Sequence, residues 1–322
     1  MKKENIKWIV LVPTILLISA ELFARFYLGL GTPPVFITHP TIEYQLKPSQ
    51  DVNRFGNRVL INQYGMRSEN FQLKKNNVNE TRVLVFGDSV INGGSLTDHN
   101  ALATTLLQSR WQQKTGQPFI VANISAGSWG PGKWLAYAKE YGLFDADIVV
   151  LVASSHDAYD APTFAPLNPD THPQQPPLSA LIEGINRYLP RYLPSWLIAK
   201  TKPKVEAVAP AKNKASLEDL HEFLALTKNK AGKVIVFLHP TKLEAETGTI
   251  EEGYQDITEL LKSENVPFIP MQPIFHKEMA KQELYRENDK IHPNSIGQNL
   301  IAETIENNIP HAWLMPSKSI TP

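Results

Sequence analysis

The chain contains no cysteine among its 322 residues. This absence excludes disulfide bonds, catalysis by a thiolate and zinc sites built from cysteine. The chain also lacks an excess of either charge, because 32 Lys and Arg residues balance 32 Asp and Glu residues. Without a basic surplus there is no sign of nucleic-acid binding, so we expect no nucleic-acid partner. What remains is a globular composition in a chain long enough to bury a substantial core.

The most informative apolar stretch lies at the N-terminus. Lys2, Lys3 and Lys7 precede an apolar run from Trp8 to Ala20. Positive charge followed by an apolar run is typical of a segment that enters a membrane with its lysines inside. The uncharged run is shorter than the about 20 residues of a full span, and continuing to Leu30 reaches that length. We therefore predict a signal anchor or transmembrane helix over residues 1–30.

Two alternatives for this segment stay open. A cleaved signal peptide would use Ile18-Ser19-Ala20 as a tolerable cleavage site, and a soluble protein would bury the helix in its core. In the anchored form, Glu21 and Arg25 would lie near the outer membrane interface. The anchor and the signal both place the remaining chain outside the cytoplasm. We expect a membrane-anchored protein whose main domain is extracytoplasmic, in the periplasm or at the cell surface.

The rest of the chain divides into a collar and a larger domain. Residues 31–80 are polar and turn-rich and contain the motif-like stretch 62–67. Over residues 81–322, short apolar runs alternate with amphipathic stretches, which predicts an α/β domain with a parallel sheet. The expected strands are 83–86, 119–124, 148–153, 234–238 and 266–269, and the expected helices are 101–113, 134–141, 217–230, 250–263 and 295–307.

A proline-rich insertion interrupts this alternation at about residues 160–215. Pro169 to Pro177 cannot form regular structure, and Lys200 to Lys214 is typical of an exposed tether. Between them, Tyr188 to Ile198 mixes tyrosine, leucine and tryptophan. An insertion of this length in an α/β domain is usually a lid, a binding loop or a linker, and we expect a mobile cover over one edge of the sheet.

Gly87-Asp88-Ser89 follows the first expected strand of the sheet directly. Ligands of open α/β sheets bind at the carboxyl edge of the strands, so a serine there faces the binding crevice. A serine hydroxyl is a weak nucleophile that needs a base, which in turn needs a third group to orient it. Because three such residues occur by chance in roughly one chain in ten, Asp88 or Ser89 could instead cap a helix.

A second motif, Asp289-Lys290-Ile291-His292-Pro293-Asn294, lies before the last expected helix. Asp289 can accept a hydrogen bond from one ring nitrogen of His292 while the other faces Ser89. The pattern Asp-x-x-His-Pro-Asn is expected by chance in only about one chain in a thousand of this length. The alternative is a helix-capping loop with an incidental histidine.

Together the two motifs resemble those of the SGNH (GDSL) hydrolase superfamily, over roughly residues 81–308. The resemblance implies a flavodoxin-like three-layer α/β/α sandwich with a five-stranded parallel sheet. It also implies Ser89 as nucleophile and Asp289 and His292 as the rest of a catalytic triad. The oxyanion hole of this family uses the N–H of the nucleophile, the N–H of a second-block glycine and a third-block asparagine.

The middle blocks depart from the family pattern. The segment 123–130 matches the second block, but an ungapped comparison places Ser128, and not Gly127, at the usual glycine. In the third block His156 occupies the place of the asparagine. An imidazole N–H can donate as an amide does, so we predict Gly127, Ser128 and His156 as oxyanion residues. The alternative is that His156 only braces its loop, through Asp157.

The sequence thus predicts a serine esterase acting on O-acyl, chiefly O-acetyl, groups of a cell-surface or exported polysaccharide. An O-acetyltransferase with the same triad and a non-catalytic polysaccharide-binding or assembly subunit are the alternatives. Aromatic residues of the insertion, Tyr188, Tyr192 and Trp196, could stack on sugars. We expect no cofactor, and a zinc site of His156, His239 and His292 has no supporting ligand spacing. His239, after the fourth expected strand, is expected in a solvated loop, and the alternative is that it contacts the substrate.

Overall fold

A computed structural model describes residues 3–194 and 215–315 of the chain. Its centre is a five-stranded parallel sheet in the order β6-β5-β7-β8-β9. The predicted α/β/α fold is therefore confirmed. The strands of this sheet are β5 (Thr81–Gly87), β6 (Phe119–Ser125), β7 (Ile148–Ser154), β8 (Val234–His239) and β9 (Phe268–Pro270).

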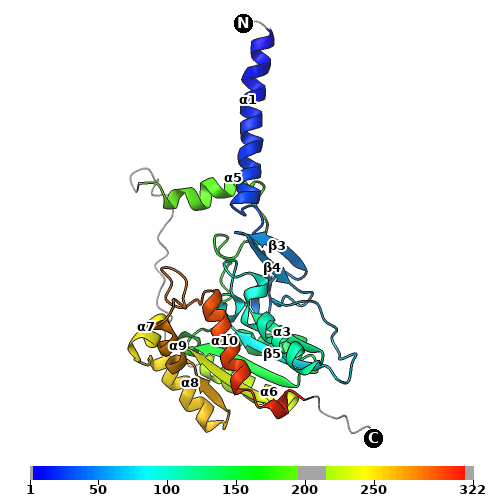
Figure 1. Ribbon diagram of the computed structural model, residues 1–322, viewed down its shortest axis with the longest axis vertical. Helices are drawn as coiled ribbons and strands as arrows, with labels where there is room; N and C mark the ends of the chain where they lie inside the picture. The colour runs from blue at the N-terminus through cyan, green and yellow to red at the C-terminus, as the bar shows by residue number, and fades with distance from the viewer. Residues whose placement is uncertain (1–2, 195–214, 316–322) are drawn as a thin grey trace.

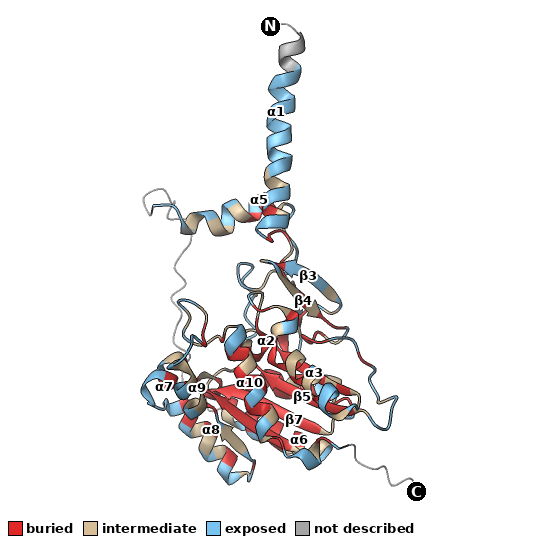
Figure 2. Ribbon diagram, in the orientation of Figure 1, coloured by how far each residue is buried: buried red, intermediate tan, exposed pale blue. Residues whose placement is uncertain are grey.

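Helices cover both faces of the sheet (Figure 1). One face is covered by α3 (Ala103–Thr115), α9 (Gln272–Met279) and α10 (Ser295–Asn308), the other by α4 (Pro131–Tyr141), α6 (Ala215–Ala231) and α8 (Glu252–Ser263). Alternate residues of β5 face the two layers, because successive strand side chains point to opposite faces. Val83 and Val85 lie in the core with α3 and α10, whereas Leu84 and Phe86 lie in the core with α4 and α6. Figure 2 shows the strands as the buried centre of the domain.

The strand order fixes where a ligand can bind. β5 is the first strand of the sheet and has β6 on one side and β7 on the other. The chain thus leaves β5 toward one edge of the sheet and later returns to build the other edge. Such a topological switch point opens a crevice outside the carboxyl ends of the strands. Ser89 lies at this end of β5.

Short helices that the sequence analysis did not predict lie in the connections. α2 (Ser89–Asn92) follows β5, and α7 (Lys242–Thr247) follows β8. α7 has a recognisable signal, because Thr241 and Glu244 form a capping box in which each side chain accepts a hydrogen bond from the backbone of the other. A helix of six residues is too short for apolar periodicity to reveal it.

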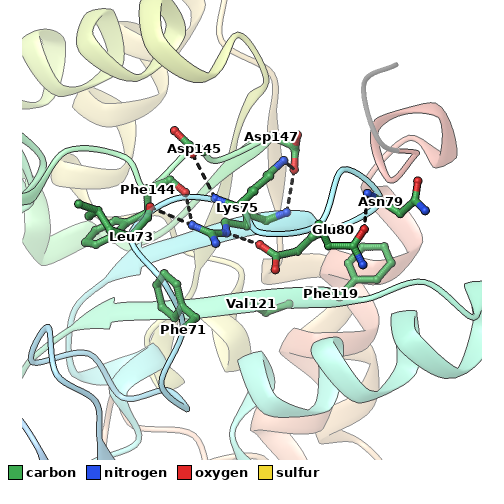
Figure 3. A network of polar contacts seen from close by, with 12 residues as sticks. Phe71, Leu73, Lys75, Asn79, Glu80, Phe119, Val121, Phe144, Asp145 and Asp147 are labelled. Atoms are coloured by element: carbon green, nitrogen blue, oxygen red, sulfur yellow. Dashed lines mark hydrogen bonds and ion pairs between the residues drawn. The ribbon is translucent and has the colours of Figure 1, made fainter. Parts of the chain in front are cut away.

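The predicted collar contains two antiparallel hairpins, β1 (Phe36–His39) with β2 (Glu43–Leu46), and β3 (Gln50–Arg54) with β4 (Asn57–Ile61). The segment after them runs to the amino-terminal edge of the main sheet, which Figure 3 shows. There Lys75 forms an ion pair with Asp147, and the buried Arg82 pairs with Glu80 and donates to the carbonyl of Phe144 at 2.7 Å. These contacts hold residues 73–82 against the amino-terminal edge of the sheet, the edge opposite the one that carries Ser89.

The N-terminal helix α1 (Lys3–Leu22) extends away from the rest of the protein (Figure 1). Its continuation through the turn Phe23–Tyr27 makes a 21-residue stretch, Lys7–Tyr27, that is long and apolar enough to cross a membrane. Only 6% of its apolar window is buried. The helix is therefore not buried in the core of the described residues, which removes the alternative of a soluble protein with a buried N-terminal helix.

The described part of the insertion, residues 160–194, packs on the collar. Glu43 accepts hydrogen bonds from the backbone N–H groups of Thr163 and Phe164, and Phe36 donates to the carbonyl of Pro173 at 2.8 Å. Glu183 forms a buried ion pair with Arg54. These polar contacts join residues 160–194 to the hairpins, and the mobility of the expected cover stays a prediction. The tether Lys200–Lys214 and Trp196 lie outside the described residues.

Candidate active site

Ser89 begins α2 immediately after β5. Gly87, the last residue of β5, has no room for a side chain, since a Cβ there would lie 2.7 Å from the side chain of Ile91 and 2.9 Å from the carbonyl oxygen of Val152. Asp88 caps α2 by accepting the N–H of Val90 at 2.8 Å. The capping alternative is thus correct for Asp88, while the hydroxyl of Ser89 is free for another partner.

That partner is His292. The Oγ atom of Ser89 lies 2.8 Å from Nε2 of His292, and Nδ1 of His292 lies 2.7 Å from Oδ2 of Asp289. The structure therefore brings the serine, the imidazole and the carboxylate together in the order that nucleophilic catalysis requires. Ser89 and His292 are 203 residues apart in the chain.

The loop that carries Asp289 and His292 is held from both sides. Asn294 caps α10 by accepting the N–H groups of Ile296 and Gly297, each at 2.9 Å. Gly297 packs on the preceding segment so closely that a Cβ would lie 2.3 Å from the carbonyl oxygen of Leu284. The asparagine and the glycine of the motif thus fix the start of α10 and, with it, the position of the imidazole.

Asp289 is held as a carboxylate. Its Oδ1 atom accepts the backbone N–H groups of Ile291 and His292, both at 2.9 Å. Partial burial raises the pKa of Asp289, but these two hydrogen bonds and the bond to the His292 ring outweigh it and lower the pKa below its ordinary value. A charged carboxylate at this position orients the ring and stabilises its protonated form.

His156 is paired with Asp88. Its Nε2 atom lies 2.9 Å from Oδ2 of Asp88, which is fully buried, and 3.8 Å from Oδ1 of Asp157. Its Nδ1 atom has no hydrogen-bond partner among the described residues. The hydrogen bond that braces His156 thus goes to Asp88, while Asp157, the partner that the alternative named, lies within ion-pair distance. Asp157 instead accepts the N–H of Ser154 at 2.7 Å.

The carboxyl groups around His156 shift its pKa, and their own pKa values depend on His156 in turn. Burial lowers the pKa of His156, but Asp157, Asp88 and Asp160 outweigh this effect and raise the pKa to about 10. Burial beside Asp88 raises the pKa of Asp157 well above its usual range, whereas the bond to His156 keeps that of Asp88 low despite burial. The raised pKa favours the protonated ring, which donates from Nε2 to Asp88 and carries its second proton on the buried Nδ1.

Asp88, His156 and Asp157 are also the one group with metal-ligand spacing in the described part of the chain. The 2.9 Å contact between His156 and Asp88 accounts for their closeness without an ion. The zinc alternative of His156, His239 and His292 is not such a group. His239 is fully buried, with its ring 4.9 Å from that of Phe275, so the expectation of a solvated loop histidine is wrong.

The Gly127-Ser128 segment follows β6. Ser128 has φ +56°, in the left-handed region that glycine adopts most readily, which fits its alignment with the glycine of the second block. The carbonyl of Gly127 accepts the hydroxyl of Tyr44 at 2.6 Å, and that of Ser128 accepts Nζ of Lys133 at 2.9 Å. These bonds fix the carbonyls. The N–H of Ser128 donates no hydrogen bond within the described residues.

A pocket of about 570 Å³ adjoins these residues. Of the six predicted site residues, all but Asp289 line it: Ser89, Gly127, Ser128, His156 and His292. Much of the remaining wall comes from the collar and the insertion, including Phe36, Phe55, His172, Arg187 and Tyr188, and the loops after α2 and before α10 complete it. The pocket has the size and mixed lining of a small-molecule site. Of the insertion aromatics, Tyr188 lines the pocket and Tyr192 is exposed.

Two buried arginines of the pocket wall were not singled out from the sequence. Arg67 donates to the carbonyls of Asn92 and Thr97, at 2.9 and 2.8 Å, and so holds the loop that follows α2. Arg54 pairs with Glu183. Arg67 is the last residue of the stretch 62–67, and the motif-like character of that stretch was the sequence feature that could have identified it. No sequence feature pointed to Arg54, because its partner Glu183 is 129 residues away in the chain.

Three of the solved structures that are similar to this chain illustrate the likeness. A two-domain esterase (CEX) active on acetylated mannans is 13% identical, with a TM-score of 0.48, over 76% of this chain and 53% of that one, so the chain spans about half its length. Axe2, an acetylxylan esterase from Geobacillus stearothermophilus, is 13% identical, with a TM-score of 0.47, over 76% and 98% of the two chains. LAE5, an α/β hydrolase enzyme from the metagenome of Lake Arreo, Spain, is 14% identical, with a TM-score of 0.45, over 70% and 94%.

A comparison with curated protein sequences finds no match. A family profile does match, and it covers the sheet from β5 to α10. The profile is that of the GDSL-like lipase/acylhydrolase family, and the match spans residues 85–300. With Ser89 and His292 inside this match, the chain belongs to the GDSL-like lipase/acylhydrolase family and is a serine hydrolase of the SGNH type.

Proposed function

We propose that the protein is a serine esterase that removes O-acetyl groups from a polysaccharide outside the cytoplasm, with Ser89, His292 and Asp289 as its catalytic triad. The observation that carries the proposal is the pair of contacts at His292. Its two ring nitrogens lie 2.8 Å from the Ser89 hydroxyl and 2.7 Å from the Asp289 carboxylate. A helix-capping loop would not need a histidine bonded at both ends.

In the proposed reaction, Oγ of Ser89 attacks the ester carbonyl while its proton moves to Nε2 of His292. The tetrahedral intermediate expels the sugar alkoxide, which takes that proton and leaves as the alcohol. Water then attacks the acyl-serine, with His292 as base, and acetate is released. Asp289 stays ionised throughout and stabilises the imidazolium.

The oxyanion of the intermediate requires donors. We assign the backbone N–H groups of Ser89 and of the Gly127-Ser128 segment, and Nδ1 of His156, to this role. The support is that Nδ1 is the one ring nitrogen of His156 without a partner among the described residues, and that the raised pKa keeps it protonated. Each such donor contributes about 3 kcal/mol to stabilising the transition state.

The substrate proposal rests on the pocket. Beside Ser89 its wall presents the rings of Phe36, Phe55 and Tyr188, which suit the faces of sugars, and it is larger than an acetyl group requires. The esterases of similar structure act on acetylated mannan and acetylxylan, so both polymers belong in the substrate panel. The location rests on the exposed apolar stretch Lys7–Tyr27 behind a lysine-rich N-terminus.

The triad is tested with the purified full-length protein in detergent. We expect hydrolysis of p-nitrophenyl acetate and labelling by a fluorophosphonate probe. Both should disappear in Ser89→Ala and fall drastically in His292→Ala, and the losses of the triad variants should not add, because the residues act as one unit. Ser109→Ala, in α3, is the matched serine control. A Ser89→Ala variant with full activity would show that another residue is the nucleophile.

The acyl acceptor and the location need separate measurements. Release of acetate from an acetylated glycan in water supports the esterase, whereas acetyl transfer to an added glycan without net acetate release would indicate the transferase. For location, the full-length protein should fractionate with membranes. Protease should reach its α/β domain only after the outer barrier of the cell is opened. Recovery in the cytosolic fraction would refute the anchor.

A further inference from the structure

A helical segment of the insertion lies crosswise to α1, at the end where α1 meets the rest of the protein (Figure 1). It consists of α5 (Ala180–Glu183), a π-helical turn (Gly184–Tyr188) and a 3-10 turn (Leu189–Arg191). We refer to residues 178–193 as the cross helix. Its position far from the sheet core raises the question of what its outer face contacts.

One face of the cross helix packs against the rest of the protein. Ala180 is buried, and Glu183 is bonded to Arg54 at 2.5 Å and to the N–H of Gly31 at 2.7 Å. Tyr188 packs edge to face on Phe55, with ring centroids 5.8 Å apart. This inner face holds the cross helix on the collar, against the wall of the pocket.

The opposite face is apolar and exposed. Its large side chains recur every three or four residues, which places them in one row along a helix. No described residue covers this row. It comprises Ile182, Ile185 and Leu189 within the helical turns, with the exposed Leu178 and Leu193 just outside them and the exposed Tyr192 beside it. An apolar row on a helix whose other face is polar and paired is typical of a helix that lies in a membrane interface.

The cross helix is attached to α1 by one carboxylate. Glu21 of α1 accepts the hydroxyl of Ser179 at 2.6 Å and the N–H groups of Ala180 and Leu181 at 3.0 and 2.9 Å. It therefore caps the start of α5, while Arg25 neutralises it at 2.7 Å. A membrane helix and the first turn of the cross helix are thus joined at one level.

That level is the end of the apolar stretch. The 21 residues Lys7–Tyr27 would extend for about 30 Å, the thickness of the hydrocarbon core. Exposed aromatic side chains mark both ends, Trp8 at the start and Phe26 and Tyr27 at the finish. Tryptophan and tyrosine concentrate at the two membrane–water interfaces. The outer interface then falls beside Glu21–Tyr27, where the cross helix begins.

We propose that the cross helix lies in the outer interface of the membrane that α1 spans, with its apolar row among the lipid chains. The inference rests on the proposed membrane anchor. The occupant of the row is lipid because the row begins at the point where α1 leaves the membrane. Since Arg187 and Tyr188 of the same segment line the pocket, the active site is held next to the membrane surface. Its substrate is accordingly a glycan presented at that surface.

The chain has no cysteine, so single cysteines can be labelled uniquely in the full-length protein. Ile185→Cys, Phe26→Cys and Leu243→Cys would each carry an environment-sensitive NBD dye, in nanodiscs of phosphatidylcholine and phosphatidylglycerol. Lipids brominated on their acyl chains quench a dye that touches them. Leu243, exposed on α7, is the matched control for an exposed apolar residue, and Phe26 reports on α1.

We expect the dye at Ile185 to lose at least about half its emission in brominated nanodiscs, as the dye at Phe26 does, while that at Leu243 is unchanged. Quenching at Phe26 but not at Ile185 would overturn the proposal and leave the anchor standing. Absence of quenching at both positions would refute the anchor as well. Shielding of Ile185 from aqueous iodide without quenching by lipid would mean that a protein surface covers the row, which also overturns the proposal.

Discussion

The imidazole of His156 lies 2.9 Å from the carboxylate of Asp88, the residue directly before Ser89. This pair joins the turn after β5 to the turn after β7 at the switch point of the sheet. Asp88 is fully buried and also caps α2. The histidine therefore neutralises a carboxylate that must stay inside the protein to hold Ser89 in place.

Substitutions at His156 distinguish a catalytic role of this residue from a purely structural one. His156→Ala should lower kcat about 10²-fold with a smaller change in KM, because a donor to the oxyanion acts mainly in the transition state. It should also lower the Tm, since Asp88 is left buried and unpaired. His156→Asn, with one amide donor, should retain more activity than the alanine variant. Equal activity and equal Tm loss in both variants would show that His156 has a structural role only.

The same residue gives the fold a sensitivity to alkali. Its pKa, about 6.5 when unfolded, rises to about 10 in the folded protein. The folded state therefore holds a proton that the unfolded chain releases. The resulting stability is fully present below about pH 6.5 and is lost as the pH rises through about 10. The Tm difference between the wild type and His156→Asn should shrink steadily from pH 7 to pH 10, and a constant difference would contradict this.

His239 gives the opposite response in acid. Burial lowers its pKa to about 3, and neither ring nitrogen has a hydrogen-bond partner among the described residues. Below about pH 6.5 the His239 ring binds a proton in the unfolded chain but not in the folded protein. The free energy of unfolding therefore falls by up to about 1.4 kcal/mol for each pH unit of acidification. His239→Leu should remove this acid-sensitive component and change the Tm little at pH 7. Identical acid unfolding curves for both proteins would refute the assignment.

The Arg54–Glu183 ion pair should be costly to break on one side. Both side chains are buried, so Glu183→Gln leaves an uncompensated guanidinium, and we expect a loss of about 3–5 kcal/mol. The double variant Arg54→Met/Glu183→Met should recover much of this stability. Glu222→Gln, from an exposed pair with Lys139, is the control and should be nearly neutral. Urea unfolding followed by circular dichroism measures all three.

Gly297 tests whether α10 positions the imidazole. A Cβ at this residue would meet the carbonyl oxygen of Leu284, so Gly297→Ala must shift α10 or the loop before it. We expect a Tm loss together with slower fluorophosphonate labelling of Ser89, because His292 moves from its 2.8 Å contact. Gly116→Ala, at the end of α3, meets no atom but has φ +68°, so it controls for a Tm loss from backbone strain far from the active site and should leave the labelling rate unchanged. An unchanged labelling rate would separate α10 from the active site.

The sequence by itself determined the features that depend on neighbouring residues. The strands and long helices follow from apolar periodicity, which is a local property. The position of Ser89 at the end of a buried strand and the placement of Asp289 three residues before His292 are also local. Short helices such as α7 and the conformation of the insertion were not predicted, because neither a six-residue helix nor a proline-rich run has a recognisable apolar periodicity.

Only the tertiary structure decided which distant groups meet. The partner of His156 is Asp88, 68 residues away, although Asp157 is adjacent in sequence. Arg54 pairs with Glu183 across 129 residues, and Glu21 of α1 caps α5 across 159. These contacts form because sheet topology and buried charge bring together groups that no local pattern relates, and each buried charge then requires the partner that chain folding places beside it.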